Sequence, residues 1–454
     1  MKASRFNFMV RSPRDPNLTF LYNSLSDSRI AVEDGDVNLR DLLQKIRRKE
    51  SLSSAETDAA MDLKEMGYLL EDSADEEEAF HAWFDRRVVE QNEILTATIL
   101  TTMACNLRCT YCYEKDKLGK SRMCPETMEK VASWLKTRID TTHPVKVNLI
   151  FFGGEPLLNV DAIRKISGDV YAHCRLRGVE YSAGMATNGI FLTPKLAEEL
   201  KSYGFQWIKI TFDGDRDQHD KKRIYQGGRG TFDQIFKNLE ACAGQLKIML
   251  GGNFDAENAD SFKGLLEKIA QSKFRDDIVA TNLKPILPEM KPSDQKNVGS
   301  TCERCTYSDF EITKMLELRR EVRAVGLTPT DPVNLGPCEY YRRNAVTIGI
   351  DGKIYKCIAF LGIEAGVIGE VGSQEFNAIG EDMLAVKPLA HPKCAKCMFV
   401  PLCAGGCRAD AFNMTGDYNR ISCQQPYFIK TLREELPLEY YEGATCAERM
   451  EVST

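Results

Sequence analysis

Three cysteines in one short loop are the first residues whose type and spacing point to chemistry. Cys105, Cys109 and Cys112 follow the pattern C-x3-C-x2-C directly after an apolar stretch. Three thiolates on one loop can hold three irons of a cubane cluster, and the fourth iron then lacks a protein ligand and can bind cofactor or substrate atoms. Zinc is the competing metal, but a structural zinc site takes four Cys or His ligands, and no histidine lies nearby. The pattern favours an iron–sulfur centre.

The number and clustering of the other cysteines point the same way. The chain has 16 cysteines, and nine of them lie between positions 302 and 423. Disulfides rarely persist in a reducing compartment, so such a count indicates metal or redox chemistry. Cys124, Cys174, Cys242 and Cys446 fit no pattern, and we expect them to pack as ordinary small side chains.

The loop around the three cysteines closely resembles the cluster-binding loop of radical S-adenosylmethionine (SAM) enzymes. The resemblance implies a 4Fe–4S cluster on Cys105, Cys109 and Cys112 whose open iron chelates the amino and carboxylate groups of SAM. An electron from the cluster then cleaves SAM to a 5′-deoxyadenosyl radical, which abstracts a substrate hydrogen. Tyr111 fits the aromatic position that packs near adenine in this family, with core packing as its alternative role.

Two strand ends resemble further SAM-binding elements of the family. The first looks like the motif that binds the SAM amino group; its glycines allow close backbone approach, and its glutamate or nearby carbonyls can accept from an ammonium. The second resembles an element that contacts the ribose, with an ordinary turn as the alternative. The residues concerned are Gly153, Gly154, Glu155 and Pro156 in the first, and Thr187 and Asn188 in the second.

A later segment resembles family members that act on peptides and proteins. Asp213, in Thr211-Phe212-Asp213-Gly214, would touch SAM or substrate, although Asp-Gly is also an ordinary turn. Arg223 would pair with a SAM carboxylate, or else be an exposed surface arginine.

The second cysteine group resembles the seven-cysteine pattern of the SPASM extension, which carries two auxiliary 4Fe–4S clusters. The resemblance assigns three cysteines to auxiliary cluster I and four to auxiliary cluster II. These are Cys338, Cys357 and Cys407 for cluster I, and Cys394, Cys397, Cys403 and Cys423 for cluster II. Seven thiolates are one ligand short of two fully held clusters, so either Cys302 or Cys305 completes cluster I, or that cluster has an open iron. Zinc in this region is the alternative.

The elements that must position these motifs alternate between strand and helix from about residue 94 to 290. Strands are expected at 94–100, 145–151, 181–187, 207–212, 247–254 and 283–287. Pro125 opens a helix whose Met128, Val131, Ala132 and Leu135 share one face. Repeated strand–helix units imply a parallel sheet. The fold class is therefore α/β, and the resemblance implies a partial (β/α)6 barrel.

The amino-terminal segment reads as a small α+β unit. Three short apolar stretches predict a hairpin or three strands, and helices are expected near 39–46 and 54–66. This combination resembles the winged-helix element that binds the leader of a precursor peptide. The sequence thus predicts a winged-helix-like unit with its linker at 1–90, a barrel at 91–300, an irregular cysteine-rich SPASM domain at 301–430 and a tail at 431–454.

Composition excludes several functional classes. The net charge of −6 provides no basic field for nucleic acid, and no uninterrupted apolar run is long enough to cross a membrane. The first residues lack the apolar core of a secretory signal, so we expect a cytoplasmic protein.

The resemblance predicts a maturase that installs a thioether or carbon–carbon cross-link in a ribosomally made precursor peptide. Its cofactors would be SAM and three 4Fe–4S clusters, and its partners a precursor with a leader and an electron donor such as flavodoxin or ferredoxin. Two alternatives remain: an anaerobic sulfatase-maturing enzyme that forms formylglycine, and a non-catalytic iron–sulfur or zinc scaffold. About 90 residues before the barrel argue against the first, and the SAM-binding motifs argue against the second.

Overall fold

Six parallel strands form the centre of the computed structural model, which describes residues 1–112, 118–286, 307–333, 338–385 and 387–451, with side chains described up to residue 441. The strands follow one another in sequence order across the sheet, and every neighbouring pair is parallel. They are β6 (Ile94–Thr102), β7 (Lys146–Gly153), β8 (Glu180–Ala186), β9 (Phe205–Thr211), β10 (Lys247–Phe254) and β11 (Ile278–Pro285). This order confirms the predicted series of strand–helix units.

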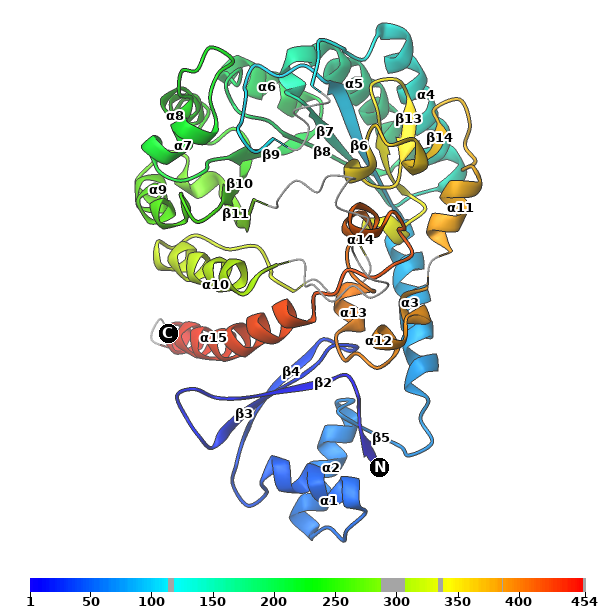
Figure 1. The fold of residues 1–454 in the computed structure, drawn as a ribbon, viewed down its shortest axis with the longest axis vertical. Helices are drawn as coiled ribbons and strands as arrows, with labels where there is room; N and C mark the ends of the chain where they lie inside the picture. The colour runs from blue at the N-terminus through cyan, green and yellow to red at the C-terminus, as the bar shows by residue number, and fades with distance from the viewer. Residues whose placement is uncertain (113–117, 287–306, 334–337, 386, 452–454) are drawn as a thin grey trace.

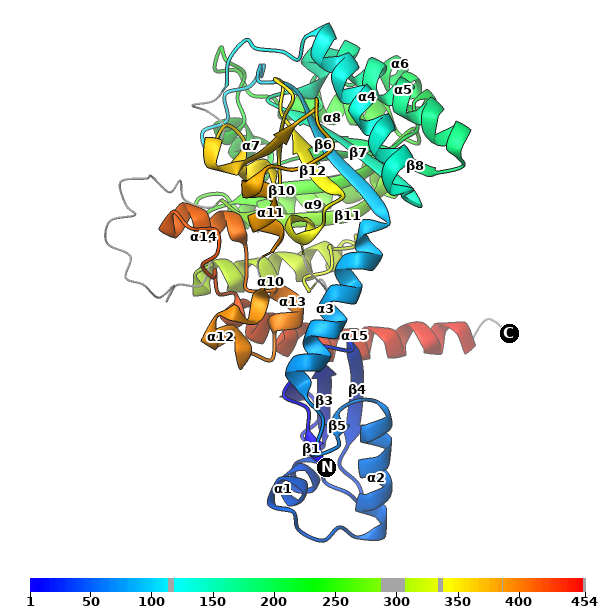
Figure 2. The same cartoon turned by 90° about the vertical axis from the view of Figure 1, so that its right-hand side faces the viewer.

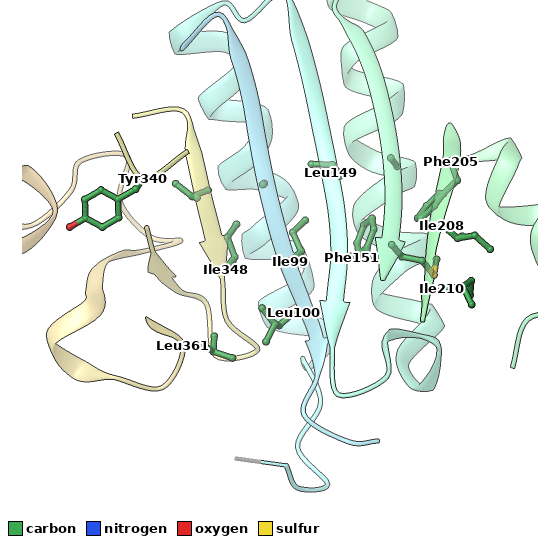
Figure 3. Close-up of a cluster of buried hydrophobic side chains, with 14 of the residues drawn as sticks. Ile99, Leu100, Leu149, Phe151, Phe205, Ile208, Ile210, Tyr340, Ile348 and Leu361 are labelled. Atoms are coloured by element: carbon green, nitrogen blue, oxygen red, sulfur yellow. The ribbon is translucent and has the colours of Figure 1, made fainter. Parts of the chain in front are cut away.

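Helices cover one face of this sheet (Figure 1). They are α4 (Pro125–Thr142), α5 (Val160–Arg177), α6 (Pro194–Ser202), α7 (Arg216–Lys222), α8 (Phe232–Ala241) and α9 (Phe262–Ala270). Alternate strand residues such as Leu149, Phe151, Ile208 and Ile210 point into the apolar core (Figure 3). The residues between them face the other side, because successive side chains of a strand alternate.

The cysteine-rich region joins this sheet instead of standing apart. β12 (Ala345–Ile348) pairs in parallel with β6, and β13 (Lys353–Tyr355) and β14 (Val367–Glu370) continue the sheet antiparallel. Beyond them lie the short helices α11 (Ala378–Leu384), α12 (Pro392–Ala395), α13 (Val400–Cys403) and α14 (Arg408–Thr415). The expectation of a wholly irregular region was wrong, since this region also contains α10 (Asp309–Ala324).

The amino-terminal unit has the strands and helices expected of it. β2 (Asn7–Arg11), β3 (Leu18–Asn23) and β4 (Ser28–Glu33) form an antiparallel sheet, and α1 (Leu39–Arg48) and α2 (Ser54–Glu65) pack on one side of it. β1 (Lys2–Ala3) pairs with β5 (Leu69–Leu70). The likeness of this unit to a winged helix stays a prediction.

One long helix links this unit to the large sheet (Figure 2). The acidic stretch after residue 70 is the start of α3 (Glu76–Asn92): Asp75 caps it by accepting from the backbone N–H groups of Glu77 and Glu78. Acidic side chains stabilise a helix N-terminus because they face the positive end of its dipole. Phe80, Trp83 and Phe84 then bury the helix in the main core.

The last segment is a helix, which corrects the expectation of a tail at 431–454. α15 (Gln425–Glu451) lies between α10 and the amino-terminal sheet (Figures 1 and 2). Phe428, Leu432 and Leu436 share an apolar cluster with Phe8 and Phe20 of that sheet. Within the described residues, no helix combines the length and apolarity that a membrane crossing requires.

Candidate active site

The three-cysteine loop begins where β6 ends and is held on one side by the turn after β7. The Gly154 N–H donates to the carbonyl of Thr102 (3.0 Å), and the Glu155 N–H donates to the carbonyl of Ala104 (2.8 Å). There is no room for a side chain here: a Cβ on Gly154 would lie 2.5 Å from the Ala104 oxygen, and one on Gly153 would lie 2.3 Å from that of Thr102. The two glycines therefore let the turn pack directly on the entry to the cysteine loop.

The segment after α7 holds the same loop from another side. Backbone N–H groups of Arg108 and Thr110 donate to the carbonyls of Ile224 (2.7 Å) and Lys222 (3.0 Å). Gln226 Nε2 donates to the carbonyl of Cys105 (2.7 Å). The loop is thus held by hydrogen bonds from two neighbouring segments.

Glu155 ties the ends of β7 and β8 together. Its side chain is 1% exposed; Oε1 accepts from Thr187 Oγ1 (2.7 Å), and Oε2 accepts from the Asn188 N–H (2.8 Å). Burial raises the pKa of this carboxyl, while these hydrogen bonds act to lower it. Asn188 Nδ2 in turn donates to Asn106 Oδ1 inside the cysteine loop (2.8 Å). The structure therefore joins the predicted residues Glu155, Thr187 and Asn188 to the loop in one network.

Pro156 follows Glu155 directly in the chain. It begins the 3-10 helix η1 (Pro156–Asn159), and its carbonyl accepts from Thr101 Oγ1 (3.3 Å). Its place is structural, next to the last residues of β6.

A second polar network joins Tyr111, Asp213 and Arg223. The Tyr111 hydroxyl donates to Asp213 Oδ2 and accepts from Arg223 Nη1 (2.9 Å). The backbone N–H of Asn253 on β10 donates to Asp213 Oδ1 (2.7 Å), and Asn253 Nδ2 donates to the Tyr111 hydroxyl (3.1 Å). Asp213 is fully buried, and burial raises its pKa, while Arg223, Tyr111 and Asn253 act to lower it. Asp213 is thus more than an exposed turn residue.

Arg223 lies inside the site, which rules out the exposed arginine considered above. Its side chain is 11% exposed, and its buried Nε has no hydrogen-bond partner among the described residues. A buried donor without a partner is costly, so an acceptor from a bound molecule would stabilise it. The arginine also acts on the loop: burial raises the pKa of the Cys105 thiol to about 12, and the charge of Arg223 opposes that rise. It opposes the raised pKa of Cys109 in the same way.

The described carboxy-terminal cysteines fall into the two sets that the sequence grouped. The Cys394, Cys397, Cys403 and Cys423 side chains line one small hollow. Burial and, to a smaller extent, the charges of the three other thiols of the set raise the pKa of Cys403 to about 12. Burial and the Cys357 charge likewise raise the pKa of Cys338 and of Cys407, the latter to about 12. Such thiols would be deprotonated on binding a cluster. Among the described residues, no group of three or more His, Cys, Asp or Glu side chains is arranged to hold a metal ion, so the cluster assignments stay predictions.

One glycine brings segments of the two cysteine sets close to each other. Gly406 has φ +90°, and a Cβ on it would lie 1.7 Å from the carbonyl oxygen of Ser422. That contact places the segment before Cys407 against the residue before Cys423. Cys302 and Cys305 lie outside the described residues, as does the side chain of Cys446. Cys124 is exposed, which corrects its assignment as a packing residue, whereas Cys174 and Cys242 are buried as expected.

The sequence did not identify Asn106, Asn253 or the backbone pairing of residues 222–226 with the cysteine loop. Asn253 carried a usable signal: a polar residue near the carboxyl end of a parallel strand is where sites of α/β folds gather. The backbone pairing of 222–226 with the cysteine loop carried no sequence signal, since any residues could make it.

Comparison with known proteins gives the same domain. Residues 99–269 match the family model of the Radical SAM superfamily. The chain is 25% identical to the AdoMet-dependent heme synthase of Methanosarcina barkeri over 356 residues, which cover 72% of this chain and 94% of that one. It is 25% identical to the radical SAM cyclopropyl synthase TigE of Paramaledivibacter caminithermalis over 289 residues, covering 59% and 57%. It is 24% identical to the cysteine-type anaerobic sulfatase-maturating enzyme of Clostridium novyi over 330 residues, covering 67% and 85%.

The solved structure of native anSMEcpe with bound AdoMet and Cp18Cys peptide has a similar fold. It superposes with a TM-score of 0.56 at 16% identity and covers 78% of this chain and 99% of that one. The cysteine loop and its SAM-type motifs lie at the carboxyl ends of the strands inside the matched residues. The chain therefore contains a radical SAM domain and resembles the radical SAM enzymes that mature ribosomally made peptides.

Proposed function

We propose that the chain is a radical SAM maturase that installs a thioether or carbon–carbon cross-link in a ribosomally made precursor peptide. The observation that carries the proposal is the cysteine loop, held rigidly at the carboxyl end of β6 beside the buried Tyr111–Asp213–Arg223 network. Cys105, Cys109 and Cys112 would hold a 4Fe–4S cluster, which when bound would supply the electron for reductive cleavage of SAM.

The chain's own residues bind and orient SAM in this proposal. Arg223 offers its unpartnered Nε to the SAM carboxylate, and the turn at Gly153 and Gly154 offers backbone carbonyls to the amino group. Asn188, tied to the loop through Asn106, lies where it can contact the ribose. Tyr111 keeps its hydroxyl in the polar network, which fixes its ring next to the loop for the adenine.

The carboxy-terminal cysteines would provide the electron outlet. Joining two side chains of a peptide removes two hydrogens, so hydrogen abstraction leaves one further electron and proton to remove. In this proposal, Cys338, Cys357 and Cys407 hold one auxiliary 4Fe–4S cluster, and the four thiols that line the hollow hold the other. Flavodoxin or ferredoxin would supply electrons to the loop. The SPASM assignment of residues 301–430 belongs to the same proposal.

The amino-terminal unit would bind the leader of the precursor. Within the described part of the chain, β4 pairs with β3 on one side only, so its other edge is open to an added strand. Main-chain pairing at a sheet edge gives affinity, and pockets for alternate side chains give register. Hydrogen exchange with a candidate precursor should protect the β4 amides and leave those of β2 unchanged; unprotected β4 amides would refute leader binding there.

Formylglycine formation remains the second candidate, supported by the relative from Clostridium novyi. The two reactions differ in their products: a cross-link only removes two hydrogens from the peptide, whereas formylglycine formation from cysteine removes two hydrogens and also replaces sulfur with oxygen. Mass spectrometry of the modified peptide separates them.

The test of catalysis uses the reconstituted chain with SAM and dithionite. We expect 5′-deoxyadenosine from the wild type and none from Cys105→Ala/Cys109→Ala/Cys112→Ala. If both proteins formed equal amounts of 5′-deoxyadenosine, the three cysteines would not be catalytic, and only a scaffold role would remain for the cysteine loop. The matched control is Cys124→Ala, an exposed cysteine that belongs to neither set.

A further inference from the structure

Two lysines stand on the face of the sheet opposite the helices. Lys209 lies on β9 between Ile208 and Ile210, which both point into the core (Figure 3). Lys284 lies on β11 between Leu283, which packs against that core, and the buried Pro285. Because strand side chains alternate, both lysines point to the opposite face.

A glycine between the two strands leaves space for them. Gly251 on β10 pairs with Thr211 on β9 and with Asn282 on β11. A Cβ on Gly251 would lie 3.3 Å from Cε of Lys209, so this side chain leans over the glycine toward the carboxyl ends of the strands. Along the strand direction, the end of the Lys209 side chain therefore comes closer to the position of Lys284.

The lysines adjoin the proposed SAM site. Lys284 pairs in register with Asn253, whose Nδ2 donates to the Tyr111 hydroxyl (3.1 Å). The residue after Lys209 on the same face is Thr211, two positions before Asp213. A molecule that touches both ammonium groups would therefore lie beside the Tyr111–Asp213–Arg223 network.

Neither ammonium group is neutralised by a described residue. Neither forms a salt bridge or a hydrogen bond within the described part of the chain, and the charge acting on Lys209 is the like charge of Lys284. Burial lowers the pKa of Lys209, and Lys284 lowers it further; burial also lowers the pKa of Lys284, although that side chain is exposed to solvent. Two cations held together among protein atoms are unfavourable unless an anion joins them.

We propose that Lys209 and Lys284 bind a carboxylate of the substrate, and so place the residue to be modified beside the SAM site. This inference rests on the proposed peptide-modifying function and names the chemistry that the peptide must carry. An Asp or Glu side chain or the carboxyl terminus of the peptide could supply the carboxylate. Carboxylates form strong charge-assisted hydrogen bonds with ammonium groups.

The test uses two pools of random acetylated octapeptides, one with amidated and one with free carboxyl termini. Each pool is equilibrated with the reconstituted chain in the presence of SAM, and retained peptides are sequenced by mass spectrometry. The variants are Lys209→Gln/Lys284→Gln and the matched control Lys247→Gln, an exposed lysine at the opposite end of β10. Retention of acidic peptides should fall about tenfold in the double variant, because about that factor corresponds to the loss of one charge-assisted hydrogen bond. Retention should stay unchanged in the control.

The arms separate the two sources of the carboxylate. Enrichment of Asp and Glu in the amidated pool assigns the site to a side chain, whereas preference for the free-carboxyl pool assigns it to the chain terminus. Equal retention by the wild type and the double variant overturns the proposal. Loss of SAM binding in the double variant also overturns it, because the carboxylate would then be that of SAM.

A measurement on the wild type guards against a misfolded variant. Brief acetylation with acetic anhydride, read by peptide mapping, should modify Lys209 and Lys284, and the retained peptides should protect both but not Lys247. Labelling that these peptides leave unchanged contradicts the proposal. Failure of the proposed function itself is distinguishable: the reconstituted chain would then form no 5′-deoxyadenosine, whatever the lysines bind.

Discussion

The two cysteine regions of this chain are built on opposite principles. The Cys105–Cys112 loop lies between regular elements and is held by backbone hydrogen bonds from the β7 turn and from residues 222–226. The four-cysteine hollow is lined by α12 and α13, helices of only four residues each. Such short helices cannot sustain themselves. In the barrel, hydrogen bonds of the fold position the thiols, whereas in the carboxy-terminal region we expect bound metal to contribute to the fold.

The four-cysteine region also contacts the amino-terminal unit. Phe399, between the second and third cysteines of the hollow, packs edge-on against Phe8 of β2 at a ring separation of 5.3 Å. Ser24 donates to the carbonyl of Met398, and Arg5 Nη1 to that of Ala395 (2.7 Å). The proposed leader-binding unit therefore contacts the segment that carries the four-cysteine set.

The largest effect is expected from Gly154→Ala. The added methyl group would push the β7 turn away from Ala104 and displace the cysteine loop. A displacement of about 1 Å at a reacting centre costs roughly a hundredfold in rate, so 5′-deoxyadenosine formation should fall by about that factor. Gly264→Ala is the control, since nothing lies within 4 Å of its Cβ position on α9. Activity within a few-fold of wild type in Gly154→Ala would show that the loop is not held by this contact.

Gly406→Ala should act on the other region. It strains a left-handed backbone and forces Ser422 away, which separates Cys423 from its partners. We expect the loss of about four irons per chain, the content of one cubane cluster, with a smaller loss of 5′-deoxyadenosine formation than in Gly154→Ala. Iron and sulfide analysis measures the first, and chromatography the second. An unchanged iron content would mean that the hollow does not hold a cluster.

Metal removal should loosen the amino-terminal unit before the barrel. Chelation leaves α12 and α13 without support, so limited proteolysis should cut first between residues 390 and 425. Phe399→Ala should weaken the same contact by about 3–5 kcal/mol, the usual cost of emptying a buried aromatic site. If the protease cut the parallel sheet earlier in time than the cysteine-rich region, the barrel and not the cysteine-rich region would be the part that depends on metal.

Glu435→Gln should have the smallest effect on chemistry and a measurable one on stability. Glu435 on α15 accepts from Arg319 Nε (2.8 Å) and from Arg323 on α10. Burial acts to raise its pKa, but the two arginines outweigh burial and hold the pKa below its ordinary value. The carboxylate therefore stabilises the fold above the ordinary glutamate pKa and loses this effect as pH falls through the lowered one.

The substitution should cost about 3 kcal/mol at neutral pH, the lower end for breaking a buried ion pair, and leave 5′-deoxyadenosine formation unchanged. Glu439→Gln, in an exposed pair with Arg29, should cost less than about 1 kcal/mol. Equal midpoints for both variants in thermal unfolding would contradict the stabilising role of Glu435.

The sequence predicted the elements that depend on local pattern. Apolar, strand-prone stretches located five of the six parallel strands, and Pro125 marked the start of α4. The sixth strand was expected at 283–287, whereas β11 begins five residues earlier and ends at Pro285. The cysteine spacings grouped thiols that the structure brings together. Local sequence pattern could not predict which distant segments pair. β12 pairs with β6 across about 250 residues. Arg223 is buried because the segment after α7 turns back onto the cysteine loop. Helix α15 was not predicted, because Pro437 interrupts its helical sequence pattern.

The central claim is that three thiol sets hold three separate iron–sulfur clusters. The most direct test is to purify and reconstitute the chain without oxygen and to count iron, sulfide and zinc per chain, in the wild type and in Cys105→Ala/Cys109→Ala/Cys112→Ala. The account predicts about twelve irons with matching sulfide in the wild type, about eight in the variant, and little zinc in either. About four irons together with zinc in the wild type, and only zinc in the variant, would contradict it and make the carboxy-terminal region structural.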